Sequence, residues 1–464
     1  MSDRGVVLVA LAAVLGARSA IPVPWPIVAA ALVVAVAVRR PTTAALAGFL
    51  LAALLAVHAW NGLTPPRPAL VDVAASLLSD PTEANGPLRV VLRIGDRRVE
   101  AWARGAQAAA LRDRLAGDHV RVRGRVRPLP PAARARLAPR HIGARLDVLE
   151  VGVWQPGSAA SRAANAVRRT LDRGARPLGD DDRSVLLGVL VGDVRDQREE
   201  VRDAFRASGL SHLLVVSGGN LAFVLALFGP ALRRLSLRTR LVATMTVIGA
   251  FGLLTRWEPS VLRASAMAAL ACASFTSGRP ASGVRLLALA VAGVVLVDPL
   301  LVHSLSFRLS VGATAGIAVL AHRVSRRIPG PRWLAEPLGV TLAAQVGVAP
   351  VALPAFGGLP LVSIPANLLA VPAAAPLTAW GFVGGVLAGV LGPPFDGWLH
   401  APTRLLTGWL LAVARHSAAL PLGQVHSGQA LTLAAVALAL RTLRSRRWSS
   451  RSVRTASTSP REPS

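Results

Sequence analysis

The sequence lacks lysine and tyrosine, has one cysteine, and carries few charged residues for its length. Of its 464 residues, 16% are charged, which is low for a soluble protein. All 52 basic residues are arginines, and the net charge is +28. The single cysteine, Cys272, excludes an intramolecular disulfide and a metal site made of several cysteines. The positive charge indicates an anionic partner, either lipid headgroups or nucleic acid.

Several catalytic motifs are also absent. No two of the nine histidines lie within three positions of each other, so the zinc motifs HxH and HExxH are missing. The sequence has neither a GxSxG elbow nor a P-loop. We therefore expect a protein that is not an enzyme and has no cofactor, no metal and no ATP-driven step of its own. Ser217-Gly218 with a distant histidine keeps a membrane hydrolase open as an alternative, although Val215 stands where intramembrane serine proteases carry glycine.

Long apolar runs make up much of the chain. The mean hydropathy is +0.50, and apolar runs recur, several of which approach the roughly 20 residues that span a bilayer. The first run, over 6–17, is followed directly by runs over 27–38 and 44–59 without a clear cleavage site, so we interpret it as a retained helix rather than a signal peptide. The fold class is an α-helical polytopic membrane protein.

The residues after 60 have a different pattern. Short segments with strand-like patterning occur over 88–94, 98–103, 119–127 and 144–154. They predict a small soluble β-domain inserted between membrane helices, of a kind that can close as a barrel. Residues 161–207 read as amphipathic helices, in which Val201 and Phe205 share one face at i, i+4.

Apolar runs return after residue 208. They lie near 209–228, 241–254, 259–275, 284–297, 303–321, 338–356, 360–372, 374–391 and 429–443, with a short run at 405–414 that we place at the interface. We therefore expect N-terminal transmembrane helices over 1–60, a β-domain over 61–160, an amphipathic linker over 161–208, a transmembrane region over 209–443 and a basic disordered tail over 444–464.

Loop arginines predict the orientation, because they favour the cytoplasmic side. With the N-terminus inside, the runs alternate so that the arginine-rich loops fall inside, at positions Arg39, Arg40, Arg233, Arg234, Arg238, Arg240, Arg279, Arg285, Arg323, Arg326, Arg327 and Arg332. The outer loops carry little positive charge. We expect a multi-pass protein of the cytoplasmic membrane, with both termini cytoplasmic and the β-domain extracytoplasmic.

Polar residues interrupt the apolar stretch SGLSHLLVVSGGNLAFVLALFGP over 208–230. His212, Ser217 and Asn220 stand within it, and the paired glycines at 218 and 219 predict a broken helix. Such a break at membrane depth lines a cavity or is buried in protein. Close packing of helices through small residues explains the glycines equally well. A similar break is predicted around Asn367, between Pro365 and Pro372.

Charged residues at membrane depth give three further candidates. Arg263 lies one turn after Pro259, which suits the first position of a helix, and Glu258 is placed to pair with it. Arg308 occupies a similar position in LSFRLSVGAT. These arginines either face a water-filled path or reach the headgroups at the interface.

Four arginines alternate with apolar or small residues in HVRVRGRVR. Arg121, Arg123, Arg125 and Arg127 share one face of the predicted strand. Arginines in a row can follow a phosphate backbone, and a solvated strand face explains them equally simply. Trp102 and Trp154 are the only aromatic residues of this domain that could stack on bases.

Four blocks of the sequence resemble a known family. GVLVGD at 188–193 with VRDAFRASGLSHLLVVSG at 201–218, EPSVLRASAMA at 258–268, DPLLVHSLSFRLSVGATAGIAVL at 298–320 and QVGVAPVALPAFGGLPLVSIPANLLAVP at 345–372 are similar to the ComEC-type competence proteins, the membrane channel of bacterial DNA uptake. The resemblance implies an OB-like outer domain and a passive conduit for single-stranded DNA, with His212, Ser217, Asn220, Glu258, Arg263, Arg308 and Asn367 along the path.

The sequence departs from that family in two ways. Gly219-Asn220 follows Ser217-Gly218 where the family often has SGLH, and the chain ends at Ser464 without the metallo-β-lactamase-like domain of many members. The implied partners are single-stranded DNA, membrane lipids, and a separate DNA receptor, nuclease and cytoplasmic motor. The main alternative is a polytopic transporter or lipid-handling protein whose outer domain is structural.

Overall fold

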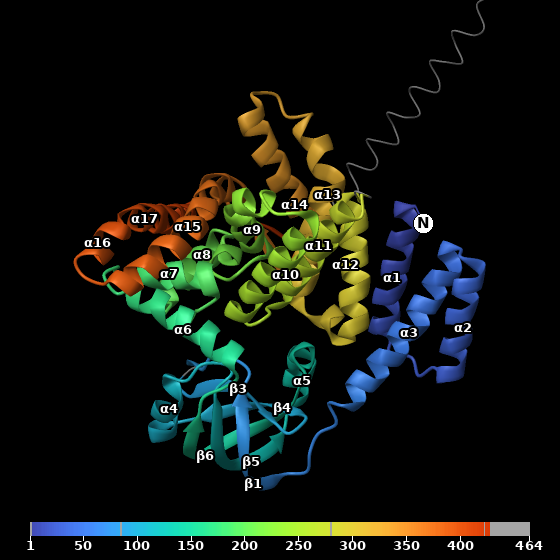
Figure 1. Cartoon of the computed structure of the whole chain (residues 1–464), viewed down its shortest axis with the longest axis horizontal. Helices are drawn as coiled ribbons and strands as arrows, with labels where there is room; N and C mark the ends of the chain where they lie inside the picture. The colour runs from blue at the N-terminus through green and yellow to red at the C-terminus, as the bar shows by residue number, and fades with distance from the viewer. Residues whose placement is uncertain (1, 84–85, 279–280, 422, 427–464) are drawn as a thin grey trace, which may run out of the picture.

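The computed structural model describes residues 2–83, 86–278, 281–421 and 423–426. Helices dominate, and one small sheet domain lies at one end of the helical part in Figure 1. The predicted apolar run at 429–443 and the predicted tail at 444–464 lie outside the described residues.

Three helices open the chain, as the apolar runs predict: α1 (Asp3–Ser19), α2 (Trp25–Val38) and α3 (Pro41–Asn61). Proline stands in the first turn of α2 and of α3, where its missing N–H group costs no hydrogen bond. Helices α1 and α3 pack closely, because a Cβ atom on Gly16 would lie 2.1 Å from the Phe49 carbonyl oxygen. Helix α1 also packs on α12.

The sheet domain contains the four predicted strands and two that the sequence did not reveal. Its strands are β1 (Ala69–Leu77), β2 (Thr82–Glu83), β3 (Leu88–Ile94), β4 (Arg97–Ala103), β5 (His119–Pro128) and β6 (Ile142–Gln155). The strand order is β1-β5-β6-β4-β3-β2, and β1 also pairs with β3, so that the sheet closes on itself. All pairs are antiparallel except β4 with β6.

Short helices complete this domain. They are α4 (Gly105–Arg112), between β4 and β5, and α5 (Pro131–Leu137) with the 3₁₀ turn η1 (Ala138–Arg140), between β5 and β6. The inward positions of β3, β4, β5 and β6 form a core of their own that includes Leu92, Ala101, Val122 and Leu146. Alternation along β5 places Val120, Val122, Gly124 and Val126 inward, as predicted.

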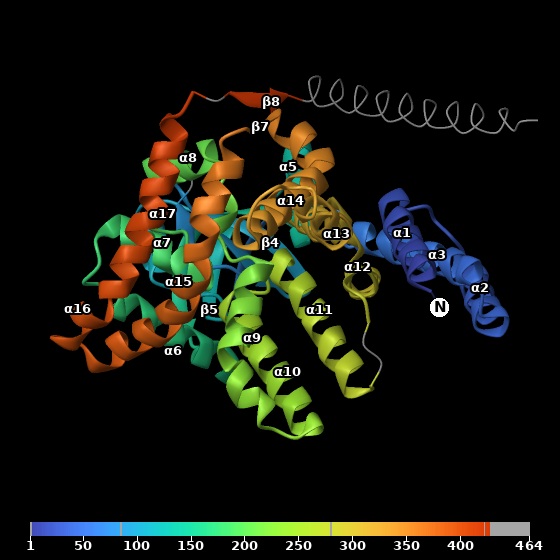
Figure 2. The same cartoon turned by 90° about the horizontal axis from the view of Figure 1, so that it is seen from above.

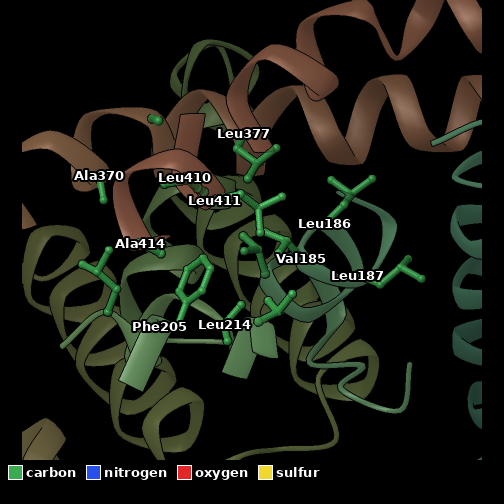
Figure 3. Packing of buried hydrophobic residues seen from close by; sticks show 14 of the residues in the cluster. Val185, Leu186, Leu187, Phe205, Leu214, Ala370, Leu377, Leu410, Leu411 and Ala414 are labelled. Carbon is green, nitrogen blue, oxygen red and sulfur yellow. The ribbon is translucent and has the colours of Figure 1, made fainter. Parts of the chain in front are cut away.

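Three helices join the sheet domain to the bundle: α6 (Ala159–Gly174), α7 (Asp180–Val191) and α8 (Glu199–Ala207). Helix α8 buries Val201 and Phe205, as its pattern predicts. The prediction of an amphipathic helix is wrong for α7, because every residue over 184–191 is buried. Helices α6, α15 and α17 contact α7, and Val185, Phe205, Leu377 and Leu410 pack in one core (Figure 3).

The rest of the chain forms a helical bundle. Its elements are η2 (Ser211–Leu213), α9 (Gly218–Arg233), α10 (Leu237–Leu254), α11 (Pro259–Thr276), α12 (Gly283–Val297), η3 (Pro299–His303), α13 (Leu305–Ser325), α14 (Arg332–Phe356), β7 (Gly358–Pro360), α15 (Ser363–Leu391), α16 (Phe395–Leu399), α17 (Ala401–Ala419) and β8 (Gln424–His426). Helices α9, α10 and α11 lie side by side (Figure 2). Strands β7 and β8 pair in a second small sheet.

Two predictions in this region need correction. The runs at 360–372 and 374–391 are one helix, α15, with Pro372 and Pro376 inside it. The break predicted between Pro365 and Pro372 is therefore absent, and Asn367 lies in the second turn of a continuous helix. Pro365 is tolerated because it stands in the first turn. Backbone N–H groups there have no intrahelical acceptor, so the N–H that proline lacks costs no helical hydrogen bond. The short run at 405–414 lies within the longer helix α17, and its placement at the interface stays a prediction.

Five described helices are long and apolar enough to cross a bilayer: Pro41–Asn61, Leu237–Leu254, Leu305–Ser325, Arg332–Phe356 and Ser363–Leu391. Shorter apolar helices are Trp25–Val38, Gly218–Arg233 and Gly283–Val297. The chain is a multi-pass membrane protein, and its predicted orientation stays a prediction.

Candidate functional site

The residues singled out in 208–230 surround the start of α9. The helix begins at Gly218, and the residues from 210 to 217 are irregular apart from the single turn η2. The predicted interruption is thus a helix start, not a break between two helical halves. Ser217 precedes the first turn, and its hydroxyl donates to Asn220 Oδ1 at 3.1 Å rather than accepting from a backbone N–H group.

Asn220 connects two helices. The residue is 6% exposed, and Nδ2 donates to the Val189 carbonyl oxygen of α7 at 2.7 Å. The amide is therefore held in a fixed position by α7 and Ser217. His212, in η2, is exposed. A Cβ atom on Gly209, which has φ +74°, would lie 2.4 Å from Ser363 Cβ, so this segment runs against the start of α15.

Arg263 lies in α11, 7% exposed, against the start of α9. Its Nε donates to Ser310 Oγ in α13 at 2.8 Å, and Nη1 lies 3.0 Å from Met267 Sδ. A Cβ atom on Gly218 would be 2.6 Å from Arg263 Nη2, so the guanidinium contacts the first residue of α9. The structure thereby places Arg263 at the start of α9, although Gly218 and Arg263 lie 45 positions apart in the sequence.

The predicted Glu258–Arg263 ion pair is absent, although the structure describes both residues. Glu258 directly precedes α11, and the cation whose charge acts on it is Arg140 of the sheet domain. Arg263 points away from it, toward α9 and α13. Pro259 stands in the first turn of α11, as predicted.

Arg308 and Asn367 lie in other surroundings. Arg308 Nε is buried and makes no hydrogen bond within the described chain, and the same holds for Nε2 of His303. The His303 ring packs edge-on against Trp60 of α3 at 5.5 Å between centroids. Asn367 is 7% exposed and donates from Nδ2 to the Ser363 carbonyl oxygen at 2.7 Å, within its own helix. His303 was not among the candidates from the sequence; it follows the apolar residues 299–302 and precedes Ser304.

The four arginines of β5 share the outer face of the sheet domain, as the alternation predicts. Three of them form ion pairs with acids of the neighbouring strands: Arg121 with Asp72 at 2.9 Å, Arg123 with Glu150 at 3.9 Å, and Arg127 with Asp147 at 3.2 Å. Arg125 makes no ion pair with a described residue. These pairs are exposed or partly exposed, and such pairs contribute little to stability and exchange readily for other anions.

Trp102 of β4 stands beside these arginines. Arg89 of β3 lies directly opposite Trp102, and the next strand, β6, places Asp147 opposite it on the other side. The Arg145 guanidinium carbon is 4.5 Å from the Trp102 ring centroid, and that of Arg89 is 5.9 Å away. We call Arg89, Trp102, Arg125, Arg127 and Arg145 the Trp102 face. The sequence does not show which residues of β4 and β6 lie opposite each other, so the Trp102 face is visible only in the folded sheet.

A buried polar cluster joins the sheet domain to the bundle. We call Asp80, Asn165, Arg168, Asp193 and Arg256 the domain joint. Arg168 of α6 is 4% exposed and donates to Asp80 Oδ2 at 2.6 Å, and it lies 3.6 Å from Asp193. Arg256, between α10 and α11, donates to Asp80 Oδ1 at 2.9 Å and to Asn165 Oδ1 at 2.8 Å.

Backbone groups complete the joint. Arg168 Nη1 donates to the carbonyl oxygens of Val191 and Leu254, at 2.5 and 2.8 Å, and the Ala116 N–H donates to Asp80 Oδ1 at 2.8 Å. Burial alone would raise the pKa of Asp80, but Arg168, Arg256 and the Ala116 N–H hold that pKa below its usual value. Asp193 has a lowered pKa as well, since Arg195 and Arg168 outweigh its burial. Among the residues that the structure describes, no cluster of three His, Cys, Asp or Glu side chains could hold a metal.

Residues 189–447 match the family described as Competence protein, which is more than half of the chain. The chain belongs to this family. The matched region contains the α9 start, Arg263, Arg308 and Asn367, and the sheet domain lies outside it. The resemblance of the sequence motifs to competence proteins is thereby confirmed.

Two curated relatives are similar in sequence to part of this chain. ComE operon protein 3 of Bacillus subtilis (strain 168) is 25% identical over 235 residues, which are 50% of this chain and 30% of the relative. The Uncharacterized protein YcaI of Escherichia coli (strain K12) is 28% identical over 212 residues, 41% of this chain and 27% of the relative. The chain thus matches less than a third of the length of either relative. No solved structure matches the chain.

Proposed function

We propose that the protein is a passive conduit through which single-stranded DNA crosses the cytoplasmic membrane during natural transformation. The observation that carries the proposal is the position of Arg263: a buried cation without a carboxylate partner among the described residues, inside the helical bundle that matches the competence family. A transmembrane bundle that keeps an unpaired cation is suited to an anionic polymer, because burying a charge without a partner is costly.

The sheet domain is the proposed first contact for DNA, on the outer side of the membrane. Its closed order, its parallel β4–β6 pair and the helix α4 between β4 and β5 support an OB-like barrel. The Trp102 face supplies an aromatic ring for base stacking with arginines around it, which is how single strands are bound without sequence preference. The ion-paired arginines of β5 then serve as replaceable phosphate contacts around that ring.

The proposed path passes the α9 start and continues along the bundle. Its polar residues are His212, Ser217, Asn220, Glu258, Arg263, Arg308 and Asn367. The protein does no chemistry on the DNA in this proposal. A DNA receptor, a nuclease and a cytoplasmic motor act as separate partners, and the motor supplies the energy.

Uptake of labelled DNA tests this function. In a transformable host from which the gene is deleted, entry of fluorescent DNA into the cytoplasm is expected to stop while binding at the cell surface continues. Complementation with the wild type restores entry, and Arg263→Ala at matched expression does not. Undiminished entry in the deletion strain would contradict the conduit.

A polytopic transporter or lipid-handling protein is the second candidate. The observation in its favour is the pairing of three β5 arginines with acids, which gives them a structural role without DNA. The two candidates differ in salt dependence: DNA binding by the full-length protein weakens steeply with salt, whereas a lipid-handling protein shows no measurable affinity for single strands.

A further inference from the structure

We propose that the first turn of α9 and the guanidinium of Arg263 together form a binding site for one phosphodiester group. We call the backbone N–H groups of Gly218 and Gly219 together with Arg263 the phosphodiester site. The inference rests on the proposed function only in taking DNA, rather than lipid, as the source of the phosphodiester.

The start of α9 provides free N–H groups. A helix N-terminus carries about half a positive charge, and its first N–H groups have no intrahelical acceptor. Here the preceding Ser217 does not cap them, because its hydroxyl donates to Asn220 Oδ1 instead. Among the described residues, no acceptor bonds to the N–H of Gly218 or Gly219. Helix α9 is 16 residues long, so its dipole is fully developed.

Arg263 is the second, independent observation. The residue is 7% exposed, and no carboxylate of the described chain lies within ion-pair distance of it. The Nε and Nη1 atoms contact neutral acceptors, Ser310 and Met267. The Nη2 atom lies against Gly218. The α9 N-terminus and the Arg263 guanidinium, both positive, therefore meet at one place, and no carboxylate of the described chain pairs with them. Burial of an unpaired charge is unfavourable, so the arrangement favours an anion from outside the chain.

The close approach depends on glycine. A Cβ atom at 218 would lie 2.6 Å from Arg263 Nη2 and 2.9 Å from Ala264 Cβ. Any other residue at this position would displace the guanidinium from the helix start. Gly219 is exposed and Ser217 is partly exposed, so one side of the site is open for a ligand to enter.

The chemistry of the site fits a phosphodiester. Each such group carries one negative charge and two free oxygens, and it can accept from backbone N–H groups and from a guanidinium at the same time. The site takes one group at a time and reads no base, so a single strand can move past it one phosphate after another. Anionic phospholipids carry the same group, and the experiment must separate the two sources.

Binding of a fluorescent oligothymidine to the full-length protein in phosphatidylcholine nanodiscs tests the site. Arg263→Ala is expected to weaken binding about tenfold, as for loss of a hydrogen bond to a charged group, and to lower the salt slope by about one. Gly218→Ala should weaken binding too, because its methyl group displaces Nη2 while the charge stays. Arg263→Lys keeps the charge and should lie between wild type and Arg263→Ala.

Two matched controls accompany these variants. Gly229→Ala changes another glycine of α9, whose Cβ would meet nothing within 4 Å, and Arg238→Ala removes an exposed arginine of α10. Both should bind like the wild type. If Arg263→Ala does not fold, as judged by size-exclusion and thermal unfolding, Gly218→Ala and Arg263→Lys decide the question.

The outcomes separate the site from the conduit. Wild-type affinity of Gly218→Ala and Arg263→Lys overturns the site, even if the deletion strain loses DNA uptake. An oligomer with a neutral methylphosphonate backbone should bind equally to wild type and Arg263→Ala, and a difference there also overturns the site. Competition by phosphatidylglycerol that Arg263→Ala abolishes, without any effect on DNA, supports the site but assigns it to lipid and counts against the conduit.

Discussion

At the scale of single residues, the folded protein gives neighbours to side chains that look isolated in the sequence. Trp102 is one of two tryptophans in the sheet domain, too few to suggest a stacking surface by number. The register of β3, β4 and β6 surrounds it with Arg89 and Arg145. Arg263 likewise contacts Gly218 and Ser310 in the folded protein, and it does not pair with Glu258 as the sequence suggested.

Trp102 is expected to carry much of the DNA affinity of the sheet domain. Trp102→Ala in the full-length protein should cost about 1–3 kcal/mol of binding free energy for single-stranded DNA, since a stacked base is lost. Trp102→Phe should retain most of the affinity. Fluorescence anisotropy measures both, with Trp154→Ala as the matched control, because Trp154 packs against Arg114 away from this group. Equal losses for the Trp102 and Trp154 variants would contradict a specific role of Trp102.

At the scale of elements, close helix contacts depend on glycines that the sequence does not distinguish from others. Helices α13 and α14 form the hairpin that projects away from the sheet domain in Figure 1. A Cβ atom on Gly316 would lie 2.2 Å from the Ala343 carbonyl oxygen, and one on Gly347 would lie 2.2 Å from the Gly312 carbonyl oxygen. Backbones approach this closely only where both surfaces lack side chains.

Gly316→Ala is therefore expected to separate α13 from α14. The added methyl group has no space, and overpacking of this kind costs about 1–3 kcal/mol. Gly293→Ala in α12 is the control, because its Cβ would meet nothing within 4 Å. Thermal unfolding of the purified protein in detergent measures both, and a midpoint for Gly316→Ala that equals the wild-type midpoint would show that the hairpin does not need this contact.

At the scale of the whole molecule, the domain joint holds the sheet domain on the bundle. Asp80 belongs to the sheet domain, Arg168 to α6, and Arg256 to the connection between α10 and α11. A carboxylate between the buried guanidinium of Arg168 and the partly buried one of Arg256 fixes the position of one domain against the other. Removal of one partner from such a buried group typically costs about 3–5 kcal/mol.

The joint predicts a loss of stability in acid. The folded-state pKa of Asp80 lies below its unfolded value, so its contribution is fully present above the unfolded pKa, about 3.9. It is lost as the pH falls through the lower, folded-state pKa, and the lowered pKa of Asp193 adds an effect of the same sign. Asp80→Asn should lower the unfolding midpoint at pH 7 and flatten its decline in acid.

Calorimetry between pH 7 and acid measures this dependence on the full-length protein. Asp72→Asn is the control, since Asp72 forms an exposed pair with Arg121. Its unfolding midpoint should change little at either end of the range. An unchanged acid decline in Asp80→Asn would place the acid sensitivity elsewhere.

The sequence by itself determined the class of the molecule. Apolar runs gave the first three helices, and strand-like patterning gave β3 to β6, because both patterns follow from local backbone geometry and burial. The motifs over 188–372 indicated the competence family, which the match over 189–447 confirms. The prediction of an amphipathic helix was wrong for α7, because a helix buried on every side has no polar face and therefore no helical period in its hydropathy.

Only the tertiary structure decided which residues meet. The closure of the barrel through β1, the single helix α15 across two prolines, the joint around Asp80, and the contact of Arg263 with Gly218 all join positions far apart in the chain. Local patterns fix which face of an element is buried. They do not fix its partner, because the partner follows from packing and from the charges that the packed elements bring together.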